Sequence, residues 1–301
     1  MTIILNGGGV ASELNYETGK LISYLRSTHD ITPHLSILMM GDDSSSRIYI
    51  RNKKLEAERL GMWAQTRTVA DKSALIQAIE YDNRDEEING IIIQLPIPGC
   101  DLVALKEILD TINPIKDVDG LTTTNLGNIA FGVPDIVPAT PLGIVKLLSH
   151  YNISTKNKHI VIDSKSNIVG KPLTNLLIHH SGAVTWCHRD TPNLGAITKQ
   201  ADILIVAVGK PNLITADMVK EGATIIDVGI TRLKRVNGGP DKIVGDVDFD
   251  SVYSKVSAIT PVPGGVGPMT VAALLRNTAL ATLRQHHLED NDVVMSHLWT
   301  A

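Results

Sequence analysis

The stretch HIVIDSKSNIVGKPLTNLL, residues 159–177, has the pattern of a buried strand, a turn and a helix. A unit of this kind opens the sheet of many dinucleotide-binding proteins, whose turn usually carries the fingerprint GxGxxG. That fingerprint is absent, and only Gly170 remains at the start of the helix. The backbone amides and the dipole of the helix can still receive a phosphate there. Ser164, Lys165 and Ser166 add hydrogen-bond donors and a positive charge beside it.

The same alternation of strand and helix continues on both sides of this stretch. Downstream, apolar runs predict strands at 183–188, 202–208 and 223–228, with helices that start near 194 and 216. Short strands are also expected at 244–248 and 256–259, followed by a helix over 268–284 and a weakly patterned tail. This alternation predicts a parallel, doubly wound sheet.

The first half of the chain has a similar rhythm. The predicted elements are helices over 12–27, 45–60, 72–81, 101–112 and 141–150, and strands over 34–41, 62–69 and 90–95. Residues 116–140 are rich in turn formers and carry no predicted helix up to 140. The fold class expected is therefore α/β, with a second, Rossmann-like sheet after the first set of elements.

Composition limits the class of protein further. Of 301 residues, 43% are apolar, 20% are charged and only 4% are aromatic, and the net charge is −4. A core of aliphatic side chains suits buried parallel strands, and the length predicts two lobes. The net charge gives no indication of a nucleic acid or an anionic membrane as a partner.

Cysteine use and the lack of an apolar run of membrane-spanning length predict a cytoplasmic protein. Cys100 and Cys187 are the only cysteines and lie far apart, which fits a reducing compartment. Residues 1–9 lack the features of a secretory signal, and no apolar run has the length of a membrane span. No His/Cys cluster has the spacing of metal ligands, so no metal is expected.

The end of the second strand of a Rossmann unit normally distinguishes NAD from NADP. An acidic side chain there accepts from the ribose hydroxyls, whereas a basic one tolerates a 2′-phosphate. The chain has Arg189 followed by Asp190 at this place. Arg189 favours NADP, and Asp190 leaves NAD open. The residues also leave open that Lys165 and Arg189 are ordinary solvated cations.

Three further groups of residues occur together and in order. They are SRIYIRNKK at 46–54, QLPIPG at 94–99 with KDVDGLT at 116–122, and TPVPGGVGPMTV at 260–271. This set closely resembles the methylenetetrahydrofolate dehydrogenase/cyclohydrolase (FolD) family, over most of the chain. The resemblance implies two α/β lobes flanking a cleft. It also implies NADP-dependent oxidation of 5,10-methylenetetrahydrofolate to the 5,10-methenyl form, and hydrolysis of that product to 10-formyltetrahydrofolate.

The resemblance assigns the catalytic residues. Tyr49 and Lys53 are four residues apart on one predicted helix, so both side chains lie on the same face. By the residues alone, catalysis by Lys53 stays open, because most lysines in a charged helix of this kind are solvated. The resemblance makes it the catalytic lysine, with Tyr49 stacking on the substrate and Gln94 holding the amine by a hydrogen bond. A lysine that moves protons near neutral pH needs a lowered pKa, which burial supplies.

Further substrate contacts follow from the same resemblance. Asp119 precedes a glycine, and such a pair is also an ordinary turn. The resemblance places its carboxylate on the pterin, where it suits two parallel N–H donors. Pro263 and Gly264 are the loop residues expected nearest the folate.

The expected cofactor is NADP, with NAD as an alternative and no metal. Members of the family usually carry Gly-Arg-Ser where this chain has Ser164, Lys165 and Ser166. A lysine keeps the positive charge but loses the bidentate fork of arginine. The full expected cofactor-binding set is Ser164, Lys165, Ser166, Gly170, Arg189 and Ile230.

The expected domains are residues 1–121 with the C-terminal helix 269–301, which bind folate and carry catalysis, and a Rossmann-like NAD(P)-binding domain over 122–268. The resemblance also implies a homodimer and tetrahydrofolate derivatives as ligands. Three alternatives remain: another nicotinamide enzyme such as an amino-acid dehydrogenase, a dehydrogenase-only folate enzyme, and a non-catalytic folate- or nucleotide-binding homologue. The first does not explain the folate motifs, and the intact set of Lys53, Gln94 and Asp119 argues against the last.

Overall fold

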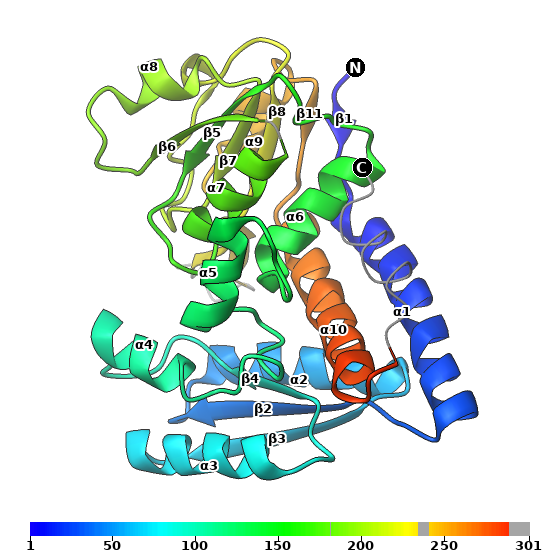
Figure 1. The fold of residues 1–301 in the computed structure, drawn as a ribbon. Helices are drawn as coiled ribbons and strands as arrows, with labels where there is room; N and C mark the ends of the chain where they lie inside the picture. Colours follow the sequence, from blue (N-terminus) through cyan, green and yellow to red (C-terminus); the bar gives the residue numbers. More distant parts are fainter. Residues whose placement is uncertain (181, 234–240, 289–301) are drawn as a thin grey trace. The chain divides into compact units, whose positions relative to one another are not determined.

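The chain forms two compact units, seen in a computed structural model that describes residues 1–180, 182–233 and 241–288 (Figure 1). One unit comprises residues 1–11 and 140–270, and we call it the six-stranded unit after its sheet. The other comprises, among the described residues, 12–139 and 271–288, and we call it the three-stranded unit. The predicted α/β class, with a Rossmann-like parallel sheet in the second half, is confirmed.

The three-stranded unit is built on a parallel sheet with the order β3-β2-β4. Its strands are β2 (His34–Met40), β3 (Trp63–Val69) and β4 (Gly90–Ile93). The central strand is buried over Leu35–Met39, and β4 is buried throughout, as their apolar runs predict. Helix α2 (Ser44–Arg59) covers one face of the sheet and α3 (Lys72–Arg84) the other (Figure 1).

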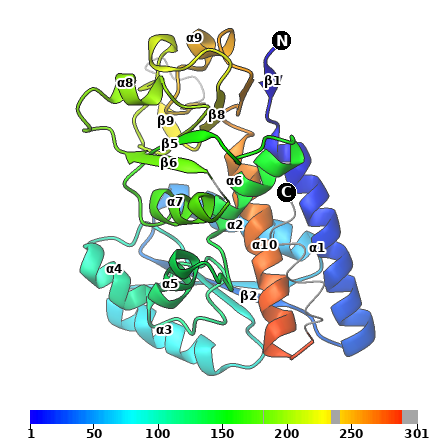
Figure 2. The same ribbon diagram turned by 45° about the horizontal axis from the view of Figure 1, so that its top comes forward.

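Two long helices lie beside each other in this unit. They are α1 (Gly7–His29) and α10 (Val266–Gln285), which run side by side in both views (Figures 1 and 2). Leu25 packs against Leu280 and Leu283 in a buried cluster. Asn277 of α10 donates to the carbonyls of Val118 and Val137, each at 2.9 Å. Buried carbonyls of a loop are thereby satisfied by a helix from the far end of the sequence.

Helix α5 (Thr123–Phe131) corrects the expectation that residues 116–140 contain only turns up to the helix near 140. Thr122 is its N-cap and accepts from the N–H of Asn125 at 3.3 Å. Gly132 follows the helix with a φ of 91°, which glycine adopts readily. The neighbouring α4 (Leu102–Leu109) is capped by Asp101, as expected, although it ends before residue 112.

The six-stranded unit contains a parallel sheet with the order β1-β11-β8-β7-β5-β6. Its strands are β1 (Ile3–Ile4), β5 (His159–Asp163), β6 (Ala183–Cys187), β7 (Ile203–Val206), β8 (Thr224–Asp227) and β11 (Ala258–Ile259). Helix α7 (Gly170–His179) lies on one face, and α8 (Leu194–Thr198) and α9 (Phe249–Tyr253) lie on the other (Figure 2). The carboxyl ends of β5 to β8 share one edge, where ligands bind in sheets of this kind.

The remaining elements of this unit complete the chain order. They are α6 (Ala139–His150), the 3₁₀ turn η1 (Ala216–Met218) and an antiparallel pair of β9 (Thr231–Leu233) with β10 (Lys242–Val244). The strand expected at 244–248 is therefore wrong, because β10 ends at Val244. In the loop that follows, the carboxylate of Asp246 accepts a hydrogen bond from the N–H of Val208. Among the described helices, none has the length and hydropathy needed to cross a bilayer.

Candidate active site

Lys53 and Gln94 meet in the three-stranded unit. Helix α2 carries Lys53, and Gln94 follows β4, where its N–H still bonds to the carbonyl of Leu38 at 2.8 Å. The amine of Lys53 donates to Oε1 of Gln94 at 3.2 Å. The other end of that amide donates to the carbonyl of Leu95 at 2.9 Å, which orients the oxygen towards the lysine. The predicted pairing of these two residues is thus present in the structure.

Asp119 approaches the same place from a neighbouring segment. Asp117 pairs with Ile91 of β4 in an isolated parallel bridge, so the chain from 117 to 119 runs alongside the end of β4. The buried carboxylate of Asp117 accepts from the N–H of Thr122 at 2.7 Å and from Nδ2 of Asn125 at 2.9 Å, which fixes the turn. The carboxylate of Asp119 is close enough to Lys53 for a direct electrostatic interaction.

Glycine is required in this turn. Gly120 has a φ of 70°, and a Cβ atom there would lie 2.8 Å from the backbone nitrogen of Pro138. Both observations exclude a side chain without movement of the backbone. The Asp-Gly pair therefore serves the turn that follows the bridge between Asp117 and Ile91.

Burial biases both ionisable groups of this cluster towards their neutral forms. It lowers the pKa of the Lys53 amine, and the Asp119 carboxylate partly opposes that shift. Burial likewise raises the pKa of Asp119, against the influence of Lys53 and reinforced by Asp117. An amine whose pKa is lowered towards neutrality can accept and return a proton during catalysis.

Tyr49 lies one turn before Lys53 on α2, and its side chain is 46% exposed. An exposed ring at this position is available for stacking on a flat ligand. Pro263 and Gly264 belong to the six-stranded unit, in the loop before α10. Gly264 has a φ of 105°, and its carbonyl accepts from the N–H of Gly8 at 3.2 Å. The loop is thus anchored to the start of α1 within its own unit.

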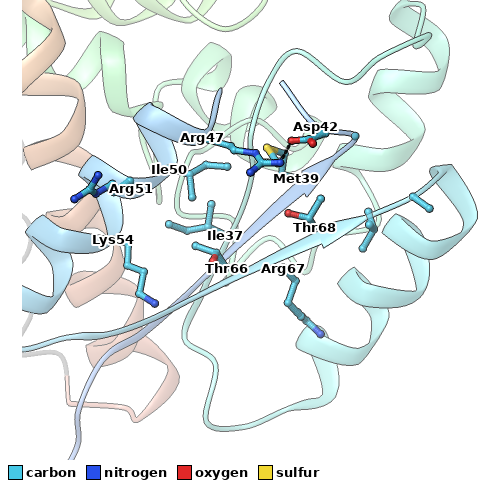
Figure 3. A pocket seen from close by; sticks show the side chains of 13 residues that line it. Ile37, Met39, Asp42, Arg47, Ile50, Arg51, Lys54, Thr66, Arg67 and Thr68 are labelled. Atoms are coloured by element: carbon cyan, nitrogen blue, oxygen red, sulfur yellow. Dashed lines mark hydrogen bonds and ion pairs between the residues drawn. The ribbon is translucent and has the colours of Figure 1, made fainter. Parts of the chain in front are cut away.

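A groove of about 770 Å³ lies on another side of α2 (Figure 3). Arg47, Arg51 and Lys54 of α2 line it opposite Thr66 and Thr68 of β3. The floor is apolar and includes Ile37, Met39 and Ile50. None of the sequence-predicted site residues lines this groove. Arg67 also lines the groove, but the guanidinium of Arg67 pairs with Asp82 on the opposite face of the sheet.

The turn after β5 is tightly packed in the six-stranded unit. Ser164 is fully buried, and its hydroxyl accepts from the N–H of Ser166 at 3.2 Å. A Cβ atom at Gly170 would lie 2.6 Å from the carbonyl oxygen of Ser164, so only glycine fits where α7 begins. The indole N–H of Trp186 on β6 donates to the same carbonyl. The first residues of α7 therefore stay close to the turn, as a phosphate site at a helix N-terminus requires.

The two expected phosphate contacts lie together. Strands β5 and β6 are parallel neighbours, with Asp163 opposite Cys187, so the loops that follow them emerge side by side. Lys165 follows β5 and Arg189 follows β6, and both pair with the carboxylate of Asp190 at 3.8 Å. Positive charge is thus concentrated beside the turn, as a ribose phosphate of NADP would require.

Ile230 lies in the loop after β8 and is 48% exposed. Its side chain approaches Gly267: a Cβ atom added to that glycine would lie 3.9 Å from Cδ1 of Ile230. The expected cofactor residues thus come from loops after three strands of one sheet. The close turn at Gly170, the cations and the exposed apolar side chain of Ile230 fit a dinucleotide.

Buried carboxyl groups at the same sheet edge were missed from the sequence. Asp163 ends β5, Asp227 ends β8, and Asp246 follows β10, all of them buried. Burial raises the pKa of Asp163 and that of Asp227 to about 6. Asp227 accepts three backbone N–H bonds, whereas neither carboxyl oxygen of Asp163 has a hydrogen-bond partner. The signal in the sequence is an Asp that ends each of two apolar runs, HIVID and TIID.

A nicotinamide-dependent α/β enzyme is the class that this fold and these two clusters define. Family models agree: the catalytic domain of tetrahydrofolate dehydrogenase/cyclohydrolase matches residues 5–119, and the NAD(P)-binding domain matches residues 138–286. The chain therefore belongs to the tetrahydrofolate dehydrogenase/cyclohydrolase family. As a member, it is an enzyme of folate metabolism with an NAD(P)-binding domain.

Individual relatives cover almost the whole chain. The bifunctional protein FolD of Streptococcus mutans is 42% identical over 287 residues, which are 94% of this chain and 99% of the relative. The crystal structure of FolD from Campylobacter jejuni is 39% identical, with a TM-score of 0.89 over 94% of this chain and 99% of that one. FolD from Trypanosoma brucei, solved with NADP and an inhibitor, is 32% identical, with a TM-score of 0.88 over 94% and 98%.

Proposed function

We propose that the chain oxidises 5,10-methylenetetrahydrofolate to 5,10-methenyltetrahydrofolate with NADP and then hydrolyses this product to 10-formyltetrahydrofolate. The observation that carries this proposal is the cluster of Lys53, Gln94 and Asp119. An amine, an amide and a carboxylate from three separate segments approach one another in the three-stranded unit. In the proposal, Asp119 holds the pterin by its N–H donors and Tyr49 stacks on the substrate.

The first step transfers a hydride from the methylene carbon between N5 and N10 and leaves a methenyl cation stabilised by both nitrogens. Bound NADP supplies the hydride acceptor. The protein's residues position the substrate: Asp119 fixes the pterin, and Tyr49 fixes the ring that follows it. Lys53 is close to the carbon that becomes cationic, so a neutral amine is preferable to an ammonium during this step.

The second step adds water to the methenyl carbon. Lys53, held by Gln94, takes a proton from the attacking water. The hydroxyl of the adduct then releases its proton to solvent as the bond from the carbon to N5 breaks, the formyl group stays on N10, and the proton held by Lys53 passes to N5. The lowered pKa of Lys53 suits both halves of this transfer, since the amine must accept a proton and release it.

The variant Lys53→Met tests the assignment, with Lys54→Met as its matched control. Lys54 is the next residue on α2, lines the groove and pairs with Glu58 at 3.7 Å instead of Gln94. With methenyltetrahydrofolate as substrate, we expect Lys53→Met to lower hydrolysis at least 100-fold. Lys54→Met should stay within about twofold of the wild type. Circular dichroism checks that both variants fold, and wild-type hydrolysis by Lys53→Met would show that the lysine is misassigned.

Supplying methylenetetrahydrofolate with NADP or NAD, and following reduced cofactor and methenyl absorbance, tests the whole proposal. Turnover that stops at the methenyl form would indicate the dehydrogenase-only alternative. Binding of folate and cofactor without turnover would indicate the non-catalytic alternative. Absence of both binding and turnover would contradict the proposed function.

We propose that residues 1–121 with the C-terminal segment 269–301 bind folate, and that residues 122–268 bind the cofactor. Within that segment α10 ends at Gln285, and residues 289–301 lie outside the described residues. The separate matches to a catalytic domain over 5–119 and to an NAD(P)-binding domain over 138–286 support a domain boundary between residues 119 and 138. We also propose NADP as the preferred cofactor, supported by the positive charges of Lys165 and Arg189. A cytoplasmic location is supported by Cys100 and Cys187, neither of which forms a disulfide.

A homodimer is the proposed assembly. Within the described residues, β6 is at the edge of its sheet and pairs only with β5. An open strand edge offers backbone hydrogen-bonding groups to a second copy. Light scattering coupled to size-exclusion chromatography would measure a mass near twice that of the chain, and a monomeric mass would contradict the assembly.

A further inference from the structure

The loops after β5 and β6 hold a carboxylate between two cations. Oδ2 of Asp190 lies 3.8 Å from Nζ of Lys165, and Oδ1 lies 3.8 Å from Nε of Arg189. These are the two residues whose charge favours NADP over NAD. Asp190 therefore offsets the charges on which recognition of a 2′-phosphate depends.

The imidazole of His188 lies against the same residue. Its Nδ1 accepts a hydrogen bond from the N–H of Asp190 at 3.3 Å and lies 3.9 Å from Oδ2 of the carboxylate. The same bond fixes the backbone of Asp190 beside the end of β6. The local balance is two cations against one carboxylate.

The three charged side chains remain free to change partners. The side chains of Lys165, Arg189 and Asp190 are 66%, 48% and 63% exposed, and their separations are longer than those of a hydrogen-bonded ion pair. Exposed pairs of this kind contribute little to stability, so parting them costs little. A ligand that offers a better anion can take both cations, whereas a ligand with a hydroxyl can use the carboxylate.

The two cofactors differ at this point of the adenosine. NADP carries a 2′-phosphate with nearly two negative charges, which Asp190 repels and the two cations attract. NAD carries a 2′-hydroxyl, which donates to a carboxylate at the end of the second strand. The same residue therefore favours one cofactor and disfavours the other.

We propose that Asp190 is a specificity-determining residue, which limits the preference for NADP by neutralising Lys165 and Arg189 and keeps NAD usable as a second cofactor. This inference rests on the proposed function, because it places the adenosine ribose beside these loops. It makes the chain a dual-specificity enzyme whose preference is set by one side chain. Charge, rather than shape, distinguishes the two cofactors.

The variant Asp190→Asn tests the inference because it keeps the shape of the side chain and removes its charge. Glu221→Gln is the matched control: it makes the same change of net charge in the same unit, on an exposed side chain before β8. That position is at the opposite end of the parallel sheet from the carboxyl ends. Calorimetry with adenosine 2′,5′-bisphosphate and with adenosine 5′-monophosphate isolates the ribose contact, and NADP and NAD are measured in parallel.

For Asp190→Asn we expect the dissociation constant of adenosine 2′,5′-bisphosphate, and that of NADP, to fall about tenfold at low salt. The dissociation constants of the monophosphate and of NAD should stay the same or rise several-fold. The gain should shrink at high salt, because the groups are exposed. Glu221→Gln should leave all four constants within about twofold of the wild type.

An equal change for both pairs of ligands, or a ratio that stays within twofold, would overturn the role of Asp190. Its partners give a second test: in a Lys165→Gln/Arg189→Gln background, Asp190→Asn should improve binding of the bisphosphate by less than in the wild type. An undiminished gain would show that Asp190 does not act through those cations. Wild-type protein that binds neither NADP nor NAD would contradict the proposed function itself.

Discussion

Lys53 and Asp119 control each other's ionisation in the three-stranded unit. Burial lowers the pKa of the lysine, and the aspartate holds that pKa up. Because the neutral amine is the base that accepts a proton from water, the hydrolysis rate should rise with pH and level off above the pKa of Lys53. The carboxylate thus has two effects, one on substrate binding and one on the pH at which hydrolysis becomes fast.

Asp119→Asn separates these effects. Removing the carboxylate withdraws the influence that raises the pKa of Lys53, so the rising limb of the pH–rate profile should move to lower pH. The KM for methenyltetrahydrofolate should rise about tenfold or more, because the pterin loses a charged acceptor. Rate profiles of hydrolysis between pH 5 and 10 measure both quantities. A limb that stays in place or moves to higher pH would contradict the coupling.

At the residue scale, the sequence predicts contacts between residues that belong to a known motif. It does not predict which ionisable side chains become buried in the folded protein. The pair of Lys53 and Gln94 follows from the resemblance, and the structure brings the two together. In the sequence, Asp163 is recognised only as the last residue of a strand. Periodicity shows where a residue lies along an element, but it does not show that the carboxyl group is buried. The opposing charge of Asp190 is visible in the sequence, but its equal distances from two cations depend on the register of β5 and β6.

At the element scale, helix α5 is too short to be predicted from the periodicity of apolar residues. The segment over 116–140 is rich in turn residues, and α5 has only nine residues. Thr122 and Gly132 at its two ends are the signals that a search for caps would have found. The long elements, such as α10 and β2, were predicted because several turns or a buried run repeat the same pattern.

Thr122→Ala tests how much the cap of α5 contributes. The side chain is buried, accepts from the N–H of Asn125 and belongs to the turn that Asp117 holds. We expect a loss of about 1–2 kcal/mol in the free energy of unfolding. Thr124→Ala, an exposed position in the first turn, should change that free energy by less than about 0.5 kcal/mol. Urea unfolding measures both, and equal losses would show that the cap is not the cause.

At the scale of the whole molecule, buried carboxyl groups make stability depend on pH. Asp163 has a pKa of about 6 in the folded chain, compared with an ordinary value of 3.8. The folded state therefore favours the protonated form of Asp163. The contribution of this group to stability is greatest below about pH 4 and is lost as the pH rises through about 6. A difference of about two pKa units corresponds to about 3 kcal/mol. Asp227, with the same pKa, adds to this dependence.

Asp163→Val should remove the part of this dependence that Asp163 contributes. Neither of its carboxyl oxygens has a hydrogen-bond partner, so an apolar side chain of similar size leaves no polar group unsatisfied. We expect the variant to be more stable than the wild type at pH 8 by about 2–3 kcal/mol, and by less at pH 5. Asp227→Asn should instead destabilise at both pH values, because that carboxylate accepts three backbone N–H bonds. Urea unfolding at the two pH values decides, and an Asp163→Val variant weaker than the wild type at pH 8 would contradict the account.

The architecture at this scale was largely predictable from the sequence. Alternating apolar runs and helical segments predicted a parallel α/β fold, and the two sheets confirm it. The two-residue strand β1, which pairs with β11 at the sheet edge, is too short for any pattern to reveal. Its place depends on a strand more than 250 residues away in the chain.

Because the Trp186 indole donates a hydrogen bond to the carbonyl of Ser164, the fluorescence of Trp186 should report cofactor binding. Indole emission responds to its surroundings, and this ring is tied to the backbone where the dinucleotide is expected. The sequence has 3 tryptophans, so replacing Trp63 and Trp299 with phenylalanine would leave Trp186 as the single emitter. Titrations of either coenzyme could then be followed by light alone, without a label and without turnover.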